Sequence, residues 1–435
     1  MSTDVQGPSP EATEPDEEIA SEVALAAPEV IANSLGEYAR IWVSRVRNGE
    51  SGALPVILGL VAIVIYFQAR SSLFLSAGNL VNLIEQAAWI VTLGMAEVFV
   101  LLLGEIDLSI GYTSALGATF TCWLLLPPNP APWPLAVLVG LAVPALFSGL
   151  EGLIVTRLRL PSFVVTLAGQ LAALGLLLEV MDSAAPSGGG SIRLYPGVLY
   201  DIENGALSPL ASWIVMAAAV ALAAAMFLVR DTRRRASNLT APPLSVTVLK
   251  IVVMAVAGVV VVLIGNTDRG VGLTVVRGVP WVVLVVLVVL VAWSFLLGRT
   301  RFGRYMYAVG GNAEAARRAG INLSRIRILA FTLAGLTAGI MGIIYTSQLG
   351  SISTGVPGGQ NVLYAVGAAV IGGTSLFGGR GKMVGAVLGG LVVAVIYNGL
   401  NLLGLGAAPQ YLWTAAVLLA AVTVDTLARR RSSAA

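Results

Sequence analysis

Two carboxylates, Glu105 and Asp107, lie in the segment GEIDLSIG at 104–111, where two long apolar runs meet. A carboxylate inside a bilayer costs about 2.5–3.5 kcal/mol on insertion scales, so it normally faces a cavity, a partner or an interface. One hypothesis is that both carboxylates, with Ser109, line a pathway or gate. The alternative, which we favour for Asp107, is that its side chain caps the next run by accepting from the amide of Ser109 or Ile110. For Glu105, a pathway and an interface stay open as alternatives.

The chain offers few other residues for chemistry. It has no histidine, which removes the commonest general base and metal ligand, and its single cysteine, Cys122, cannot form a disulfide within the chain. The segment GGRGKM at 378–383 resembles a phosphate-binding loop, but Met383 and Leu376 replace two residues that this motif requires. We therefore expect no catalytic residue, no metal ligand and no cofactor, and any ATP must be bound by another chain.

The elements that position these groups are membrane-spanning helices. Hydrophobic residues make up 57% of the chain and charged residues 11%, against about 25% charged residues in soluble proteins. Apolar runs recur at the length that crosses a bilayer, roughly 17–24 residues. The fold class is therefore an all-α polytopic membrane protein of about 12 transmembrane helices, of which the third and tenth are the most plausible broken or re-entrant segments. The runs are 53–69, 80–103, 108–126, 134–156, 161–181, 210–229, 247–265, 279–297, 326–346, 362–376, 383–405 and 409–427.

The basic residues orient these helices. With the N-terminus inside and strict alternation, all but four of the 26 Lys and Arg residues fall on the inner side, as the positive-inside rule requires. Both termini are therefore predicted to be cytoplasmic. Because the basic residues occupy short loops, they indicate membrane orientation and no binding of nucleic acid.

Three domains follow from composition. Residues 1–50 are polar and acidic and read as a disordered cytoplasmic tail, with a possible interfacial helix at 39–47. Residues 51–428 form the transmembrane domain, and 429–435 a basic cytoplasmic tail.

Small and polar residues inside the apolar runs suggest helix contacts. Gly381, Gly385 and Gly389 have the spacing that lets helices approach closely, and packing within one subunit is favoured over a dimer seam. Polar groups could either form interhelical hydrogen bonds or line a pathway, and both interpretations stay open. Tyr397 and Trp413 are interpreted as packing aromatics rather than sugar-stacking platforms. The polar groups in question are Glu97, Glu151, Asn398 and Asn401.

The cytoplasmic loop 298–325 contains a short predicted helix. Gly310 and Gly311 are expected to break the chain, Asn312 to cap the helix that follows, and Gly320 to end it. A helix this short is marginal on its own, so it is either a simple connection or an element that a docking partner stabilises. The residues of this helix, with its bounding glycines, are Gly311, Asn312, Ala313, Glu314, Ala315, Ala316, Arg317, Arg318 and Gly320.

Four motifs in order resemble the permease subunits of bacterial ABC importers for monosaccharides, the ribose, xylose and galactose group. They are GEIDLSIG at 104–111, LPSFVVTLAG at 160–169, FGRYMYAVGGNAEAARRAGIN at 302–322 and VIGGTSLFGGRGKMVGAVLGG at 370–390. The chain departs from the group at Glu105, where Gly is usual, and at Val362 and Tyr364, where acidic residues often occur. An additional helical pair at about 210–265 makes its layout similar to the longer xylose-type permeases.

The resemblance implies a subunit without covalent chemistry in the bacterial plasma membrane. It implies a separate ATPase subunit that receives 311–320 as a coupling helix, an external solute-binding protein, a second permease copy, and a monosaccharide substrate such as the pentose xylose. The first two motifs would then contribute to the translocation pathway or gate. The residues in question are Glu105, Asp107, Ser109, Pro161, Ser162, Phe163 and Thr166.

Two other functions stay open as alternatives. One is the related branched-chain amino acid importer permease. The other is a proton- or sodium-driven secondary transporter, for which the membrane carboxylates could serve as relays, although it leaves the 311–320 helix unexplained.

Overall fold

The computed structural model describes residues 36, 54–184, 190–237, 241–270, 275–406, 408–413, 415–416, 419 and 423. The predicted acidic tail at 1–50, except Gly36, the interfacial helix at 39–47 and the basic tail at 429–435 lie outside these residues, and the twelfth apolar run is described only in part.

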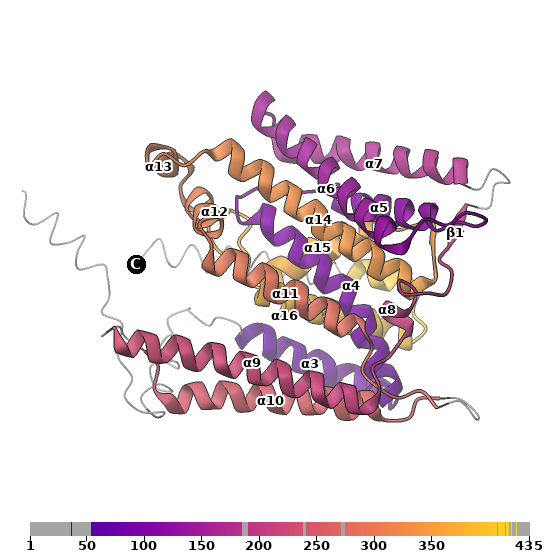
Figure 1. Cartoon of the computed structure of the whole chain (residues 1–435), viewed down its shortest axis with the longest axis vertical. Helices are drawn as coiled ribbons and strands as arrows, with labels where there is room; N and C mark the ends of the chain where they lie inside the picture. The colour runs from indigo at the N-terminus through magenta and orange to yellow at the C-terminus, as the bar shows by residue number, and fades with distance from the viewer. Residues whose placement is uncertain are drawn as a thin grey trace, which may run out of the picture.

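The structure confirms the all-α polytopic prediction, because each of the first eleven apolar runs is a helix (Figure 1). Within the described residues, eight helices are long and apolar enough to cross a membrane, and α3, α5 and α15 are shorter. The eleven helices are α3 (Leu54–Arg70), α4 (Ala77–Leu101), α5 (Ile110–Leu124), α6 (Trp133–Leu158), α7 (Ser162–Ala184), α9 (Pro209–Ala236), α10 (Leu244–Asn266), α11 (Val282–Arg299), α14 (Leu323–Leu349), α15 (Gly358–Ile371) and α16 (Met383–Leu402).

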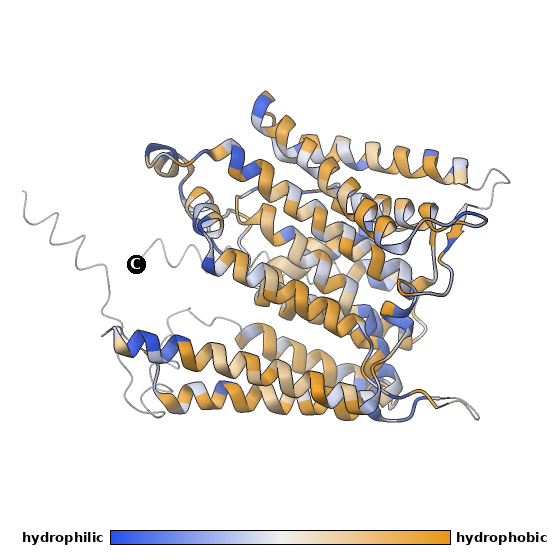
Figure 2. Cartoon of the chain, viewed as in Figure 1, coloured by the Kyte–Doolittle hydropathy of each residue, from blue (hydrophilic) through white to orange (hydrophobic). Residues whose placement is uncertain are grey.

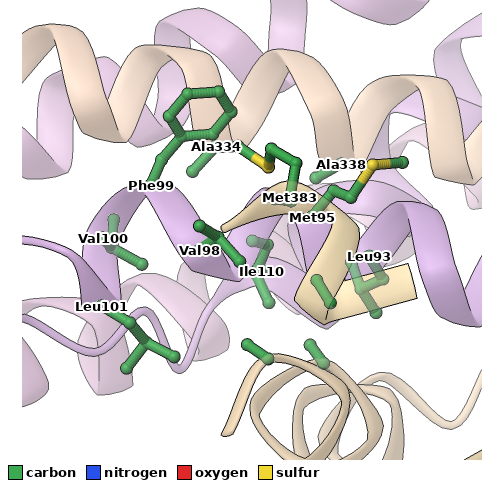
Figure 3. Close-up of a cluster of buried hydrophobic side chains, with 14 of the residues drawn as sticks. Leu93, Met95, Val98, Phe99, Val100, Leu101, Ile110, Ala334, Ala338 and Met383 are labelled. Atoms are coloured by element: carbon green, nitrogen blue, oxygen red, sulfur yellow. The ribbon is translucent and has the colours of Figure 1, made fainter. Parts of the chain in front are cut away.

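Helix α4 forms the centre of the bundle. Its most apolar stretch is 83% buried inside the protein, whereas the corresponding stretches of α9 and α10 are only 6% and 11% buried. Figure 3 shows Met95 and Phe99 of α4 beside Ala338 and Ala334 of α14. A helix that is apolar all round is buried in a core or faces lipid, so α4 is the core helix and the α9–α10 hairpin faces lipid.

Small residues allow the closest helix contacts. A Cβ atom at Gly335 of α14 would overlap the carbonyl oxygen of Pro144 in α6, and one at Gly389 of α16 would overlap that of Ala368 in α15. Gly385 faces Gly372 in the same way, and Gly381 faces Thr374. The three glycines at 381, 385 and 389 therefore all contact neighbours of the same chain.

Polar elements lie at the two ends of the bundle (Figure 2). At the outer end, β1 (Ser191–Arg193) pairs antiparallel with β2 (Ser351–Ser353), with Ile192 opposite Ile352, and α8 (Asp201–Asn204) lies against the end of α14. At the inner end lie α12 (Arg301–Gly311) and α13 (Ala313–Arg318).

The chain does break before α13, but at Asn312, directly after the two glycines that were predicted to break it. Helix α12 continues through both glycines and ends at Gly311, and its apolar face buries Met306 and Val309. The physical reason is close packing, since a Cβ atom at Gly310 would overlap the carbonyl oxygen of Leu102. Gly310 is thus a contact position and not a helix terminator.

Candidate functional site

The segment between α4 and α5 is an irregular break inside the bundle. Helix α4 ends at Leu101, Gly104 has a φ of 74°, and α5 begins at Ile110. Asp107 Oδ1 accepts hydrogen bonds from the Ser109 amide (2.9 Å) and the Ser109 hydroxyl (2.6 Å). The expected bond from Asp107 to the Ser109 amide is therefore confirmed. The residue directly before α5, however, is Ser109 and not Asp107.

Three buried carboxylates meet at this break, and we call them the carboxylate cluster: Glu97 of α4, Asp107 and Glu151 of α6. All are at most 4% exposed. The Asp107 amide donates to Glu97 Oε1 (3.3 Å), and Ser109 Oγ lies 3.0 Å from Glu151 Oε2. Each carboxylate keeps one buried oxygen without a hydrogen-bond partner. The cluster thus joins the break to α6 through Ser109 and to α4 through the Asp107 amide.

The charges around the cluster are all of one sign. In the part of the chain that the structure describes, no Lys or Arg forms an ion pair with the three carboxylates. Glu105, two residues before Asp107, instead pairs with Arg327 of α14, whose Nε lies 3.2 Å from Glu105 Oε1. Glu105 is therefore held at the start of α14, and the cluster must be neutralised by other means than an ion pair.

The second motif supplies α7, which covers the cluster. Thr166 Oγ1 donates to the carbonyl of Ile106 in the break (3.3 Å), and a Cβ atom at Gly169 would overlap Glu151 Oε1. Ser162 is buried at the start of α7, but Pro161 and Phe163 are exposed and do not reach the cluster. The structure therefore brings Thr166 to the break, and it adds Gly169, which sequence reasoning did not select.

Helix α13 has the expected local structure. Asn312 Oδ1 accepts from the Ala315 amide (2.9 Å), and Gly320 has a φ of 81° just beyond the helix. Glu314 pairs with Arg317 (2.8 Å) and Arg318 (3.2 Å). These pairs lower the pKa of Glu314 and raise that of Arg317. The charged face is exposed, and Ala316 is buried.

Two of the four motifs, 302–322 and 370–390, meet the end of α4 at one inner junction, which we call the glycine junction. The Gly379 amide donates to the carbonyl of Leu102 (2.9 Å), against which Gly310 also packs. Tyr307 of α12 donates to the carbonyl of Gly381 (2.8 Å). The end of α4, the C-terminal end of α12 and the loop before α16 are therefore in direct contact, and this contact was not evident from the separate motifs.

An aromatic group occupies the core further along α4. Trp89 lies 5.3 Å from Tyr345, 6.0 Å from Tyr364 and 5.9 Å from Tyr397, measured between ring centroids. Tyr364 and Val362 are both 3% exposed. These contacts support the packing interpretation of Tyr397. Trp413 also lies near an aromatic ring, 6.2 Å from Tyr66.

The polar residues that were left open are hydrogen-bonded between elements. Asn398 of α16 donates to Gln86 (3.1 Å) and accepts from Asn79 (2.9 Å), both on α4. Asn401 accepts from Gln410 (2.7 Å). Glu97 and Glu151 belong to the carboxylate cluster. Of the four polar residues whose role the sequence left open, these two are the ones that are buried and keep a carboxylate oxygen without a hydrogen-bond partner.

Comparisons with known proteins agree with this architecture. Residues 79–424 match a family model described as the branched-chain amino acid transport system, permease component. The chain is 34% identical over 385 residues to the xylose transport system permease protein of Escherichia coli K12, covering 87% of this chain and 92% of that protein. It is 32% identical to the corresponding Haemophilus influenzae protein (88% and 99%) and 30% identical to the ribose import permease protein of Escherichia coli K12 (86% and 93%). No solved structure matches the chain.

Proposed function

We propose that this chain, which belongs to the family described as the permease component of the branched-chain amino acid transport system, is the transmembrane permease subunit of an ATP-driven monosaccharide importer. The observation that carries the sugar assignment is the alignment of 87% of the chain with the xylose permease. The ribose relative supports the same substrate class, and xylose is the favoured sugar. A branched-chain amino acid is the second candidate, because the family description names it.

In this proposal the chain forms the passage and other chains supply energy and substrate. It is a transport component of the bacterial plasma membrane and not an enzyme. A separate ATPase subunit hydrolyses ATP at the inner side, and an external solute-binding protein delivers the sugar at the outer side. A second copy of the permease completes the importer as a homodimer.

Helix α13 is the proposed contact with the ATPase. Its charged face is exposed at the inner end of the bundle, where Glu314, Arg317 and Arg318 have side-chain exposures of 51–79%. Its geometry is fixed by the Asn312 cap and by the chain reversal at Gly320. A short capped helix with an exposed face of both charges suits insertion into a groove of a partner.

The glycine junction is the proposed route from the ATPase to the passage. Because Gly310 and Gly379 both contact the carbonyl of Leu102, a displacement of α12 and α13 reaches the end of α4 without an intervening side chain. The break that follows carries Glu105, Asp107 and Ser109, which we propose as gate residues together with Ser162 and Thr166 of α7. Pro161 and Phe163 are exposed, so within this proposal they contribute at the surface of α7.

The decisive experiment tests coupling through α13. The double variant Glu314→Gln with Arg317→Gln is reconstituted with the ATPase and the binding protein, and uptake of a panel of labelled sugars is measured. We expect loss of ATP-dependent uptake with normal membrane insertion, because the variant removes two of the three charges of the exposed face and leaves the cap in place.

A matched control is Arg233→Gln, an exposed residue at the inner end of α9, which should retain uptake. If the double variant transports as well as the unaltered protein, α13 is not the coupling element. Uptake of leucine in place of any sugar would select the second candidate. Uptake that survives ATP depletion but collapses with an uncoupler would identify a secondary transporter.

A further inference from the structure

We propose that Glu151 is a neutral carboxylic acid that donates its proton to the Ser109 hydroxyl and thereby fixes the break between α4 and α5. Glu151 is then a positioning residue, since it acts on the break through Ser109. The effect on uptake rests on the proposed function, but the protonation state of Glu151 does not.

Ser109 has fewer hydroxyl protons than it has carboxylate neighbours. A serine hydroxyl has one proton to donate, yet two carboxylate oxygens lie within hydrogen-bond distance: Asp107 Oδ1 at 2.6 Å and Glu151 Oε2 at 3.0 Å. The shorter distance is typical of a hydroxyl bound to an ionised carboxylate. The serine proton is therefore assigned to Asp107, and the contact with Glu151 needs a proton of its own.

Two groups could supply that proton, and geometry selects one. Thr113 Oγ1 lies 3.2 Å from Ser109 Oγ and can donate to the serine, but its proton then lies in the Thr113–Ser109 contact and not in the contact between Ser109 and Glu151. A hydroxyl oxygen accepts two hydrogen bonds, so Ser109 can accept from both Thr113 and Glu151 while it donates to Asp107. A proton on Glu151 Oε2 completes this arrangement with no unsatisfied contact at the serine.

The surroundings of Glu151 favour the neutral form. The break presents Asp107 and α4 presents Glu97, both acidic, whereas α7 presents only Gly169 and Thr166. From α14, Phe331 and Ile328 pack against Gly152, and Arg327 is already paired with Glu105. A carboxylate that is 4% exposed and has no cationic partner is expected to take up a proton instead of remaining charged.

The bond has a mechanical consequence, because it connects two parts of the bundle. Glu151 lies on α6, next to Gly152, which packs against Phe331 of α14. Ser109 ends the break whose other end, Leu102, contacts the glycine junction. The proton of Glu151 therefore ties the α6–α14 pair to the segment that lies against α12. Ionisation of Glu151 would replace this tie with repulsion between two carboxylates.

The test compares Glu151→Gln with Glu151→Leu. The glutamine amide can still donate to Ser109 Oγ, whereas leucine fills the space without a donor. We expect Glu151→Gln to keep uptake within about twofold, and Glu151→Leu to lose about tenfold, the equivalent of one buried hydrogen bond. As pH rises, uptake by the unaltered protein should fall before uptake by Glu151→Gln does.

Infrared spectroscopy reads the proton directly in the purified full chain. The spectrum of the unaltered protein minus that of Glu151→Gln should contain the carbonyl stretch of a protonated carboxylic acid at neutral pH. The same difference for Glu179→Gln, an exposed position on α7, serves as the control.

Each outcome decides the proposal. A carboxylate band in place of the carboxylic acid band overturns it, whatever the transport result. Equal loss of uptake in Glu151→Gln and Glu151→Leu, with the acid band present, refutes the tie to Ser109. If no substrate is transported by the unaltered protein, the proposed function fails, and the infrared result still stands or falls by itself.

Discussion

The acidic residues of this protein occur in two opposite settings, the carboxylate cluster and helix α13. On α13, Glu314 has a side-chain exposure of 51% and pairs with two arginines three and four residues away. In the cluster, Glu97, Asp107 and Glu151 are at most 4% exposed; Asp107 and Glu151 share Ser109, and Glu97 accepts from the Asp107 amide. On α13 the carboxylate is thus neutralised by arginines close in sequence. In the cluster the carboxylates are stabilised by hydrogen bonds from residues distant in sequence and by protonation.

This difference indicates a division of labour between the two regions. Exposed ion pairs contribute little to stability, because water and salt screen them, so the charges of α13 are available to a partner. Buried carboxylates are costly unless they are satisfied, so the cluster can exist only where the fold holds its members together. The glycine junction connects the two regions, and the predictions below test each of them in turn.

The largest effect is expected at the junction itself. In Gly310→Ala the new methyl group would overlap the carbonyl oxygen of Leu102 and lie 2.6 Å from the amide nitrogen of Gly379. We expect loss of ATP-coupled uptake and a fall in stability of about 1–3 kcal/mol, as overpacking of a core causes. Thermal unfolding and uptake by the reconstituted importer measure the two effects.

The matched control is Gly298, an exposed glycine near the end of α11. A Cβ atom at Gly298 meets nothing within 4 Å, so Gly298→Ala should leave both stability and uptake unchanged. Equal behaviour of the two variants would mean that α12 does not transmit motion through Leu102, and the two regions would then be independent.

The helices were predictable from the sequence because their signal is local. The second apolar run was predicted at 80–103 and is found as α4 at Ala77–Leu101, since a continuous apolar run determines its length. The cap at Asn312 and the charge pairs of α13 were predictable for the same reason, because their partners lie within four residues.

The missed features depend on contacts between distant residues. Ser109 and Glu151 are 42 residues apart, so neither the carboxylate cluster nor the role of Gly169 could be inferred from spacing. Helix α12 was missed because it is short and amphipathic instead of a continuous apolar run. It also ends in two glycines, which favour a break when no tertiary contact is known. The pairing of β1 with β2 joins residues about 160 positions apart.

The second prediction concerns Glu203 of α8, a buried carboxylate at the outer end. It is 3% exposed, and neither of its carboxylate oxygens has a hydrogen-bond partner. Burial, with a smaller effect from the charge of Glu85, raises the pKa of Glu203 to about 10. The folded protein therefore favours the protonated form, and its stability should fall as pH rises from the ordinary pKa towards that value. The expected slope is about 1 kcal/mol per pH unit between about pH 6 and about pH 9.

Thermal unfolding across this pH range checks the prediction. Glu203→Gln should remove the slope, because the amide does not titrate. Asp268→Asn is the control, since backbone amides and Arg277 lower the pKa of the exposed Asp268, which is therefore ionised throughout the range. If stability still falls with pH in Glu203→Gln, the pH dependence belongs to another group. Glu203 would then not be a protonated carboxylic acid of the kind proposed for Glu151.

The smallest effect is expected on α13. It tests whether the exposed ion pairs stabilise the helix or leave its stability unchanged. Asn312→Ala removes the cap that the Ala315 amide uses, and loss of such a cap costs about 1 kcal/mol, equivalent to about fivefold faster amide exchange within the helix. Glu314→Gln removes both ion pairs but leaves the cap, so exchange of the amides at 313–318 should change less than about twofold. Hydrogen exchange of the permease alone, at low and high salt, measures both variants. If Glu314→Gln accelerated exchange as much as Asn312→Ala did, the charges of α13 would be structural, as those of the carboxylate cluster are, and they would not be free for the ATPase.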